Sequence, residues 1–240
     1  MTYDLMGVNM KILGYIFLFA FFAASYQVGS QVLSESDTII FFGDSITQLG
    51  DRPDGFITLI RDTLVTKLGV NAPRIINAGI SGNKVTDLQG RLVRDVIQKK
   101  PTIVVIYIGI NDVWHYALPG LKGTPKDVYE SELKNIVSKI KASGAKVFLC
   151  TPTVIGEKRH GTNPQDTMLD EYAALSVRVA YETNSTLIDL HSAFLNYLRN
   201  SNPDNLREGI LTVDGVHLNT AGNQLVASEI LRALQEEKLF

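Results

Sequence analysis

The stretch Ile-Ile-Phe-Phe-Gly-Asp-Ser-Ile-Thr occupies residues 39–47 and predicts a buried strand that ends in a glycine turn. Its first four residues are apolar without polar alternation, which is typical of a parallel strand covered on both faces. The turn presents the hydroxyl of Ser45 at the carboxyl end of that strand. Taken alone, such a serine is either the cap of the next helix or a nucleophile.

Apolar runs of the same kind alternate with amphipathic stretches along the rest of the chain. Together with 38–43, the runs predicted to be strands are 74–78, 103–109, 145–151 and 185–190. The predicted helices cover about 55–68, 85–99, 127–143, 166–183 and 219–237. This alternation predicts an α/β fold, a three-layer α/β/α sandwich around a five-stranded parallel sheet.

Length and composition narrow the possible classes of protein. The 240 residues are enough to bury a full core, and no linker or repeat divides residues 35–240, so we expect one domain there. The net charge of −2 argues against binding to nucleic acid, which normally needs a basic surface. Cys150 is the only cysteine, so an internal disulfide and a multi-cysteine zinc site are excluded, and we expect Cys150 to be buried.

The first thirty residues differ from the rest. Residues 12–24 carry no charge, follow Lys11, and precede small and polar residues. The run is shorter than the ~20 residues that cross a bilayer, so residues 1–30 are predicted to be a secretory signal peptide, with translation starting at Met1 or Met10. We therefore expect a secreted or periplasmic mature chain without a stable membrane span. An uncleaved membrane anchor is the alternative.

A carboxylate and an imidazole lie three residues apart at Asp214 and His217. This spacing lets the carboxylate hold Nδ1–H while Nε2 faces outward as a base, although an ordinary surface turn gives the same pattern. His115 and His160 also have an acidic residue three positions earlier. His191 lacks one, and we interpret it as structural. The residues alone leave the choice of base open.

An oxyanion hole needs donors that converge on one point, and three candidates follow predicted strands. They are the backbone N–H groups of Ser45 and Gly79 and the side-chain amide of Asn111. Each also has a simpler interpretation, because Gly79 and Asn111 are common residues of strand-ending turns. Their shared place at one edge of the sheet favours acyl-transfer chemistry.

The chain resembles the SGNH hydrolases, also called GDSL esterases and lipases. Four blocks carry the resemblance, in family order: Gly43-Asp44-Ser45-Ile46, Asn77-Ala78-Gly79, Gly109-Ile110-Asn111-Asp112 and Asp214-Gly215-Val216-His217. The resemblance implies a flavodoxin-like fold and an ester hydrolase with a Ser45-Asp214-His217 triad. It implies an oxyanion hole of Ser45, Gly79 and Asn111, and neither metal nor cofactor.

Two long connections, 111–126 and 152–166, are predicted to form the walls of a substrate site. Trp114, His115 and Tyr116 follow Asn111 closely, and their polar-tipped rings favour a short acyl group, such as acetyl, on a carbohydrate or similar polar carrier. Alternatively, Trp114 and Tyr116, with the nearby leucines, line a groove of a lysophospholipase or short-chain lipase. A catalytically silent carbohydrate-binding module is the alternative from another class. A small-molecule or glycan ester is thus the expected partner.

Overall fold

A parallel five-stranded sheet forms the centre of the protein, which we describe from a computed structural model covering residues 32–240. The strand order is β2-β1-β3-β4-β5, the flavodoxin-like order. The strands are β1 (Thr38–Gly43), β2 (Arg74–Gly79), β3 (Ile103–Tyr107), β4 (Lys146–Cys150) and β5 (Thr186–Ile188). This architecture confirms the predicted fold class. The predicted signal peptide at 1–30 lies outside the described residues.

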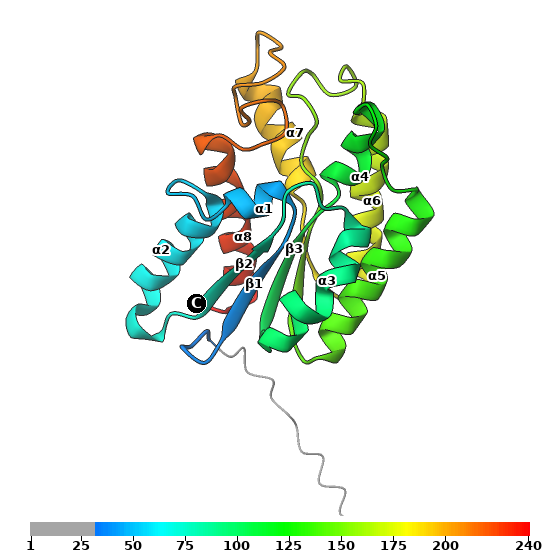
Figure 1. Cartoon of the computed structure of the whole chain (residues 1–240). Helices are drawn as coiled ribbons and strands as arrows, with labels where there is room; N and C mark the ends of the chain where they lie inside the picture. The colour runs from blue at the N-terminus through cyan, green and yellow to red at the C-terminus, as the bar shows by residue number, and fades with distance from the viewer. Residues whose placement is uncertain (1–31) are drawn as a thin grey trace, which may run out of the picture.

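Helices cover both faces of the sheet (Figure 1). On one side, α2 (Phe56–Leu68) packs against α8 (Thr220–Glu236), with α7 (Leu190–Ser201) beside α8. On the other side, α5 (Lys126–Ala142) packs between α3 (Val85–Asp95) and α6 (Asp166–Glu182). Apolar side chains at helical spacing explain how α5 docks, and those that are buried are Tyr129, Leu133, Ile136, Val137 and Ile140.

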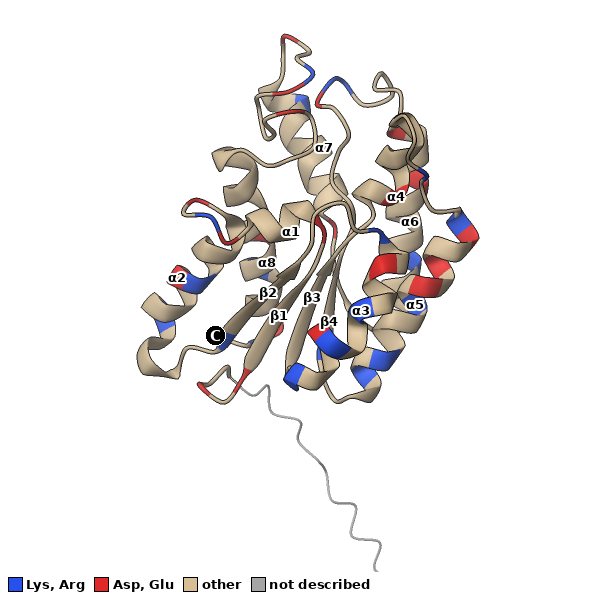
Figure 2. Ribbon diagram, in the orientation of Figure 1, with Lys and Arg blue, Asp and Glu red and all other residues tan. Residues whose placement is uncertain are grey.

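The outer surface carries charges of both signs. Figure 2 shows Lys and Arg interspersed with Asp and Glu along the outward side of α5, whereas the strands of the sheet are almost free of charge.

Cys150 is buried at the end of β4, as predicted. Within residues 32–240, no helix is both long and apolar enough to cross a membrane.

The register of the sheet brings the ends of three strands to one edge. Gly43 of β1 pairs with Gly79 of β2 on one side and with Tyr107 of β3 on the other. The segments that follow these strands therefore start beside one another. They include two short helices, α1 (Ser45–Leu49) and α4 (Ile110–Trp114).

The largest difference from the sequence prediction lies at β5 and the segment that follows it. The predicted strand at 185–190 is only three residues long, and α7, which was not predicted, begins at Leu190. Asp189 ends the strand because its side chain accepts a hydrogen bond from the Ser192 backbone N–H and caps the new helix. The predicted helix at 85–99 is also interrupted, since α3 ends at Asp95 and a short 3₁₀ turn, η2 (Ile97–Lys99), follows.

Asp44 caps α1 from a buried position at the end of β1. Its Oδ1 atom accepts a hydrogen bond from the Ile46 backbone N–H at 2.9 Å. Burial raises the pKa of Asp44 to about 7, with a smaller contribution from the nearby carboxyl group of Asp112, although the hydrogen bond from Ile46 opposes the rise. Burial also raises the pKa of Asp112 to about 6. Two acidic groups therefore lie in the apolar interior beneath the sheet edge.

This burial predicts a pH-dependent stability. Because the pKa of Asp44 rises from 3.8 to about 7 on folding, the folded chain keeps a proton there that the unfolded chain has already released. The stabilising contribution of protonated Asp44 is present below about pH 4 and is lost as the pH rises toward 7. Asp44→Asn keeps the size and the cap acceptor but does not titrate.

The measurement is the free energy of unfolding by urea at several pH values between 4 and 7, for the wild type and for Asp44→Asn. The wild type is expected to lose stability relative to Asp44→Asn as the pH rises. Parallel profiles for the two proteins would contradict the burial of an uncompensated Asp44 carboxylate.

Candidate active site

Ser45 is the first residue of α1 and its hydroxyl meets the imidazole of His217. The Oγ atom lies 3.0 Å from Nε2 of His217, a contact between residues 172 positions apart. Ser45 is buried by the surrounding turn, with 8% of its surface exposed. The turn after β1 therefore delivers the serine hydroxyl to a histidine that comes from the far end of the chain.

Asp214 holds His217 by both main chain and side chain. Its Oδ2 atom lies 2.7 Å from Nδ1 of His217, and its Oδ1 atom accepts the backbone N–H groups of Val216 and His217. Burial tends to raise the pKa of Asp214, but the hydrogen bonds from His217 and Val216 outweigh it and lower the pKa. The ionised carboxylate fixes the hydrogen on Nδ1, so the lone pair of Nε2 faces the Ser45 hydroxyl.

Asn111 lies in the first turn of α4 and is almost completely buried. Its Nδ2 atom donates one hydrogen bond to the carbonyl of Asn83 at 3.0 Å. An amide carries two hydrogens on this nitrogen, so a second one is free for another acceptor. The bond to Asn83 fixes the plane of the amide and joins α4 to the turn that follows β2.

Gly79 does not fit the oxyanion role that the sequence suggested. Its N–H already donates to Oδ1 of Asn77 at 2.8 Å. A Cβ atom at Gly79 would lie 2.2 Å from the backbone nitrogen of Gln48, so the glycine is needed for the close approach of β2 to α1. The prediction for Gly79 is therefore corrected, because its donor is occupied and its small size has a packing reason.

Gly82 offers the donor that Gly79 lacks. It lies in the turn after β2 at a φ of +77°, a conformation that favours glycine. Within residues 32–240 its N–H has no hydrogen-bond partner, and its neighbour Asn83 is the residue that contacts Asn111. The sequence signal was available, since Gly82 follows the Asn-Ala-Gly block by three residues, but nothing in the sequence showed which N–H was occupied.

Of the three predicted substrate contacts, only Trp114 reaches the site. Its ring lies edge-on to the ring of His217, with 6.1 Å between the centroids. His115 is buried, and burial lowers its pKa. Tyr116 packs its ring over Gly123, where a Cβ atom would lie 2.2 Å from the ring. Neither His115 nor Tyr116 lines the cavity beside Trp114.

That cavity has a volume of about 410 Å³ and a mixed lining. Trp114, Leu118 and Ile155 provide apolar surface, whereas Lys158 and Arg207 provide positive charge. The two cations come from different segments, the connection after β4 and the irregular segment before Asp214. A polar molecule with an apolar group fits such a lining better than a long hydrocarbon chain does.

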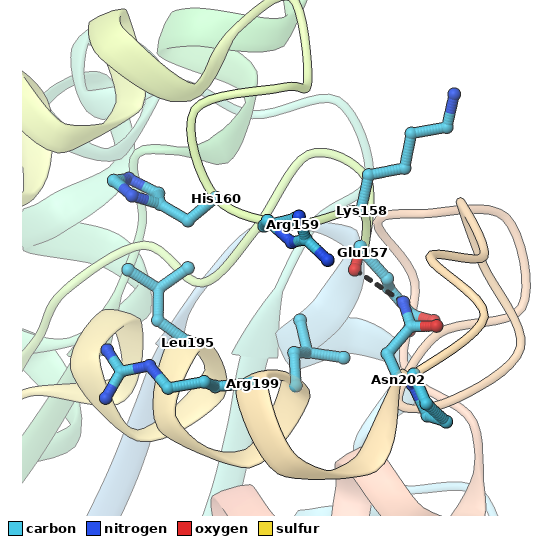
Figure 3. Close-up of a pocket in the computed structure, with 9 residues that line it drawn as sticks. Glu157, Lys158, Arg159, His160, Leu195, Arg199 and Asn202 are labelled. Atoms are coloured by element: carbon cyan, nitrogen blue, oxygen red, sulfur yellow. Dashed lines mark hydrogen bonds between the residues drawn. The ribbon is translucent and has the colours of Figure 1, made fainter.

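Glu157 positions the segment that carries Asp214 and His217, and the sequence analysis did not identify this role. Its side chain is fully buried and accepts hydrogen bonds of 2.5–2.7 Å from the backbone N–H groups of Ile210, Leu211 and Thr212 and from the Thr212 hydroxyl. The Glu157 carbonyl also accepts from Nδ2 of Asn202 at 2.8 Å (Figure 3). The connection after β4 and the segment before His217 therefore lie side by side at one end of the molecule (Figure 1).

The two other acid–histidine pairs that a three-residue spacing suggested, Asp112 with His115 and Glu157 with His160, do not form. The carboxylate of Asp112 accepts the Val85 backbone N–H, and that of Glu157 faces the backbone of 210–212. The remaining histidines meet elsewhere, because His160 and His191 both contact Asp170 on α6. This trio is the one group within residues 32–240 whose arrangement could hold a metal ion. Ser45, Asp214 and His217 are thus the residues whose chemistry and geometry suit acyl transfer.

The chain is similar to several known esterases. An acetylxylan esterase of Geobacillus stearothermophilus is 33% identical over 219 residues, which cover 84% of this chain and 95% of that enzyme. A crystal structure of an acetyl xylan esterase, AlAXEase, is 44% identical and superposes with a TM-score of 0.80, covering 82% of this chain and 99% of that one. An isoamyl acetate-hydrolyzing esterase 1 homolog of Rattus norvegicus is 27% identical, over 78% of this chain and 77% of its own length.

Residues 41–225 match the GDSL-like lipase/acylhydrolase family. The matched range covers most of the chain and contains Ser45, Asn111, Asp214 and His217. The chain therefore belongs to the GDSL-like lipase/acylhydrolase family and is a serine ester hydrolase.

Proposed function

We propose that this protein removes acetyl groups from a carbohydrate, using Ser45 as nucleophile, His217 as base and Asp214 as the group that orients the base. The observation that carries the proposal is the unbroken hydrogen-bonded series from Asp214 Oδ2 through the His217 ring to Ser45 Oγ. Each partner has the orientation that its role requires.

The reaction follows from this arrangement. Ser45 Oγ attacks the ester carbonyl carbon while its proton moves to Nε2 of His217. The resulting oxyanion accepts hydrogen bonds from the Ser45 and Gly82 N–H groups and the free amide hydrogen of Asn111. The C–O bond then breaks, and His217 returns the proton to the leaving sugar hydroxyl. A water molecule then gives a proton to His217 and attacks the acetyl-enzyme. The bond between the acyl carbon and Ser45 Oγ breaks, Oγ takes the proton back from His217, and acetate leaves.

The lining of the cavity beside Trp114 supports a polar carrier for the acetyl group. The indole offers a flat apolar face of the kind on which sugar rings stack, and Lys158 and Arg207 offer hydrogen-bond donors to hydroxyl or carboxylate oxygens. The acetylxylan esterases among the relatives support the same substrate class. Two solved structures of the Geobacillus enzyme are described as catalytic mutants, one at a serine and one at a histidine.

The alternatives have less support. A lipase groove of Trp114, Tyr116, Leu118 and Leu121 is not continuous, because Tyr116 and Leu121 lie outside the cavity and both are about half exposed. A catalytically silent carbohydrate-binding module does not explain why the Ser45 hydroxyl and the His217 lone pair face each other.

We also propose that the protein is exported and acts outside the cytoplasm, where polymeric carbohydrate is met. The charged start and short apolar run of residues 1–30 support this. N-terminal sequencing of protein recovered from the medium or periplasm tests it, with a new terminus expected between Tyr26 and Ser36. An unprocessed, cell-retained chain would contradict the proposal.

The first prediction concerns the nucleophile. Ser45→Ala should lower ester hydrolysis by roughly 10³-fold or more, and adding His217→Ala should cost little extra because the triad acts as a unit. A fluorophosphonate probe should label Ser45. Labelling of a different serine, together with an active Ser45→Ala variant, would refute the mechanism.

The second prediction concerns the oxyanion donor on α4. Asn111→Ala should reduce kcat by about 10²–10³-fold with a smaller effect on KM, because the amide binds an oxygen whose charge develops only in the transition state. Steady-state kinetics on p-nitrophenyl acetate measure both constants. If only KM changes, Asn111 is a binding residue for the ground state.

The third prediction concerns Glu157. Glu157→Gln places an NH₂ group against backbone N–H donors, which should lower the free energy of unfolding by about 1–3 kcal/mol. It should also lower kcat roughly 10–100-fold, because His217 shifts relative to Ser45. Glu208→Gln is the matched control, since Glu208 is an exposed acid in the same segment.

Fluorophosphonate titration separates positioning from simple unfolding. A positioning role lowers the rate per folded molecule, whereas a purely structural role lowers only the number of folded molecules. Unchanged kcat per folded molecule in Glu157→Gln would refute the positioning role.

The fourth prediction concerns the acyl group. The value of kcat/KM should fall from acetyl to octanoyl p-nitrophenyl esters, because the cavity beside Trp114 is lined by Lys158 and Arg207 and gives a long hydrocarbon chain little apolar surface. Trp114→Ala should relax this preference by making room. Acetylated xylo-oligosaccharide should be a better substrate than lysophospholipid, with Ser45→Ala as the blank. An optimum at octanoyl or longer would favour the lipase alternative instead, since an open groove gains about 0.8 kcal/mol per buried CH₂.

A further inference from the structure

Three side chains outside the triad converge where the connection after β4 meets α6 and α7. His160 comes from that connection, Asp170 from α6 and His191 from the first turn of α7. The Nε2 atoms of both histidines lie 2.9 Å from the same oxygen, Oδ1 of Asp170, and His160 Nε2 is 3.0 Å from Oδ2. In Figure 3 the His160 side chain points away from Glu157 and Asn202.

The ring of His191 is fixed by a main-chain acceptor. Its Nδ1 atom lies 2.6 Å from the carbonyl oxygen of Thr153. A carbonyl oxygen can only accept, so Nδ1 carries the hydrogen. In the neutral ring, Nε2 then has a lone pair and no hydrogen, and this lone pair faces the Asp170 carboxylate.

Two electron-rich atoms at 2.9 Å repel each other unless something positive lies between them. One solution is a second proton on His191. The other is a cation bound by both atoms. Histidine ligands of metals characteristically donate their second ring N–H to a backbone carbonyl, which is the relation between His191 and Thr153.

The donor set suits a divalent transition metal. Two imidazole nitrogens and one carboxylate oxygen are a common combination for zinc, and each of these ligand atoms lies within 4.8 Å of the others. A tetrahedral zinc ion at about 2.0–2.1 Å from each donor separates neighbouring donors by about 3.3 Å. His160 and Asp170 are close to half exposed, so they can move apart by the few tenths of an ångström required.

The three groups already surround one point. The lone pair of His191 Nε2 faces Oδ1 of Asp170, and His160 Nε2 lies at the same 2.9 Å from that oxygen. Little rearrangement is therefore needed to bind a metal ion there.

We propose that His160, Asp170 and His191 form a binding site for a divalent transition-metal ion, with zinc as the expected occupant. The ion ties the connection after β4 to α6 and α7. It does not take part in ester hydrolysis, since none of the three ligands contacts Ser45, Asp214 or His217. Its effect is to stabilise the connection that also bears Glu157.

The test uses the untagged protein, so that no added histidines bind metal. After removal of metal with a chelator, zinc is titrated calorimetrically and bound zinc is counted by elemental analysis. We expect one zinc per chain, and Co²⁺ should give visible absorption bands of a tetrahedral nitrogen–oxygen site. At free zinc about 100-fold above Kd, Tm should rise by roughly 5–10 °C.

Matched variants locate the site. His160→Gln and Asp170→Asn should each weaken zinc binding at least about 10-fold and abolish the rise in Tm. Glu171→Gln makes the same acid-to-amide change one residue further along α6 and should bind zinc normally. His217→Ala should also bind normally, which separates this site from the triad. Hydrolysis of p-nitrophenyl acetate at 25 °C should be unchanged by chelation.

Two results would overturn the proposal. Without saturable zinc binding to the wild type, the cluster is an imidazolium–carboxylate ion pair and not a metal site. If zinc binds but His160→Gln and Asp170→Asn bind it equally well, the ion lies elsewhere. Neither result bears on the esterase proposal, which is tested on Ser45 and Asn111.

Discussion

The buried carboxylate of Glu157 is the interaction on which the geometry of the active site most depends. Ser45 sits on a turn fixed by the sheet, but Asp214 and His217 lie in a segment that is neither helix nor strand. Such a segment has only one isolated bridge, between Thr212 and Leu218, so most of its backbone N–H groups need partners from elsewhere. The Glu157 carboxyl group accepts hydrogen bonds from three of those backbone N–H groups and from the Thr212 hydroxyl. The 3.0 Å contact between Ser45 and His217 is therefore set by a residue that touches neither of them.

A buried carboxyl group can serve this purpose only because its oxygens have hydrogen-bond partners. Polar oxygens without partners in the protein interior are strongly unfavourable, whereas several short N–H and O–H donors compensate for the lost water. Asp44 and Asp112 accept fewer hydrogen bonds, which do not offset their burial, and their pKa values are raised. The protein thus contains two kinds of buried acid. Glu157 accepts four hydrogen bonds and organises a segment, whereas Asp44 and Asp112 hold protons more tightly than acids in water.

The sequence predicted the fold well because the signal for it is local. Runs such as Ile39–Phe42 are apolar on both faces, and only a covered parallel strand accommodates them. It missed α7, although Leu190, Phe194 and Leu198 recur at helical spacing, because Leu190 was assigned to the preceding strand. Ser45 and Asn111 are predicted by their places at strand ends, whereas the choice of Asp214 and His217 needs the resemblance to the family. Glu157 could not be predicted, since a glutamate between glycine and lysine looks exposed, and its partners lie more than 50 residues away. The sequence indicates Gly79 and not Gly82, because a sequence does not show that the Asn77 side chain occupies the Gly79 N–H.

His217 and His191 share one local arrangement, a hydrogen-bond acceptor at Nδ1, but differ in their chemistry. In both rings an acceptor fixes the hydrogen on Nδ1, the Asp214 carboxylate in one case and the Thr153 carbonyl in the other, so that Nε2 presents a lone pair in a fixed direction. The group that faces this lone pair decides what the ring does. The lone pair of His217 faces the Ser45 hydroxyl, which has a proton to give, so the ring acts as a base. In front of His191 Nε2 is the Asp170 carboxylate, which has no proton to give, so the contact needs a positive charge between the two atoms, which the proposed metal ion supplies. Both sites thus share an acceptor at Nδ1, and they differ in the group that faces Nε2. The Ser45 hydroxyl makes the His217 site a reaction centre. The Asp170 carboxylate makes the His191 site a link between α6, α7 and the connection that carries Glu157.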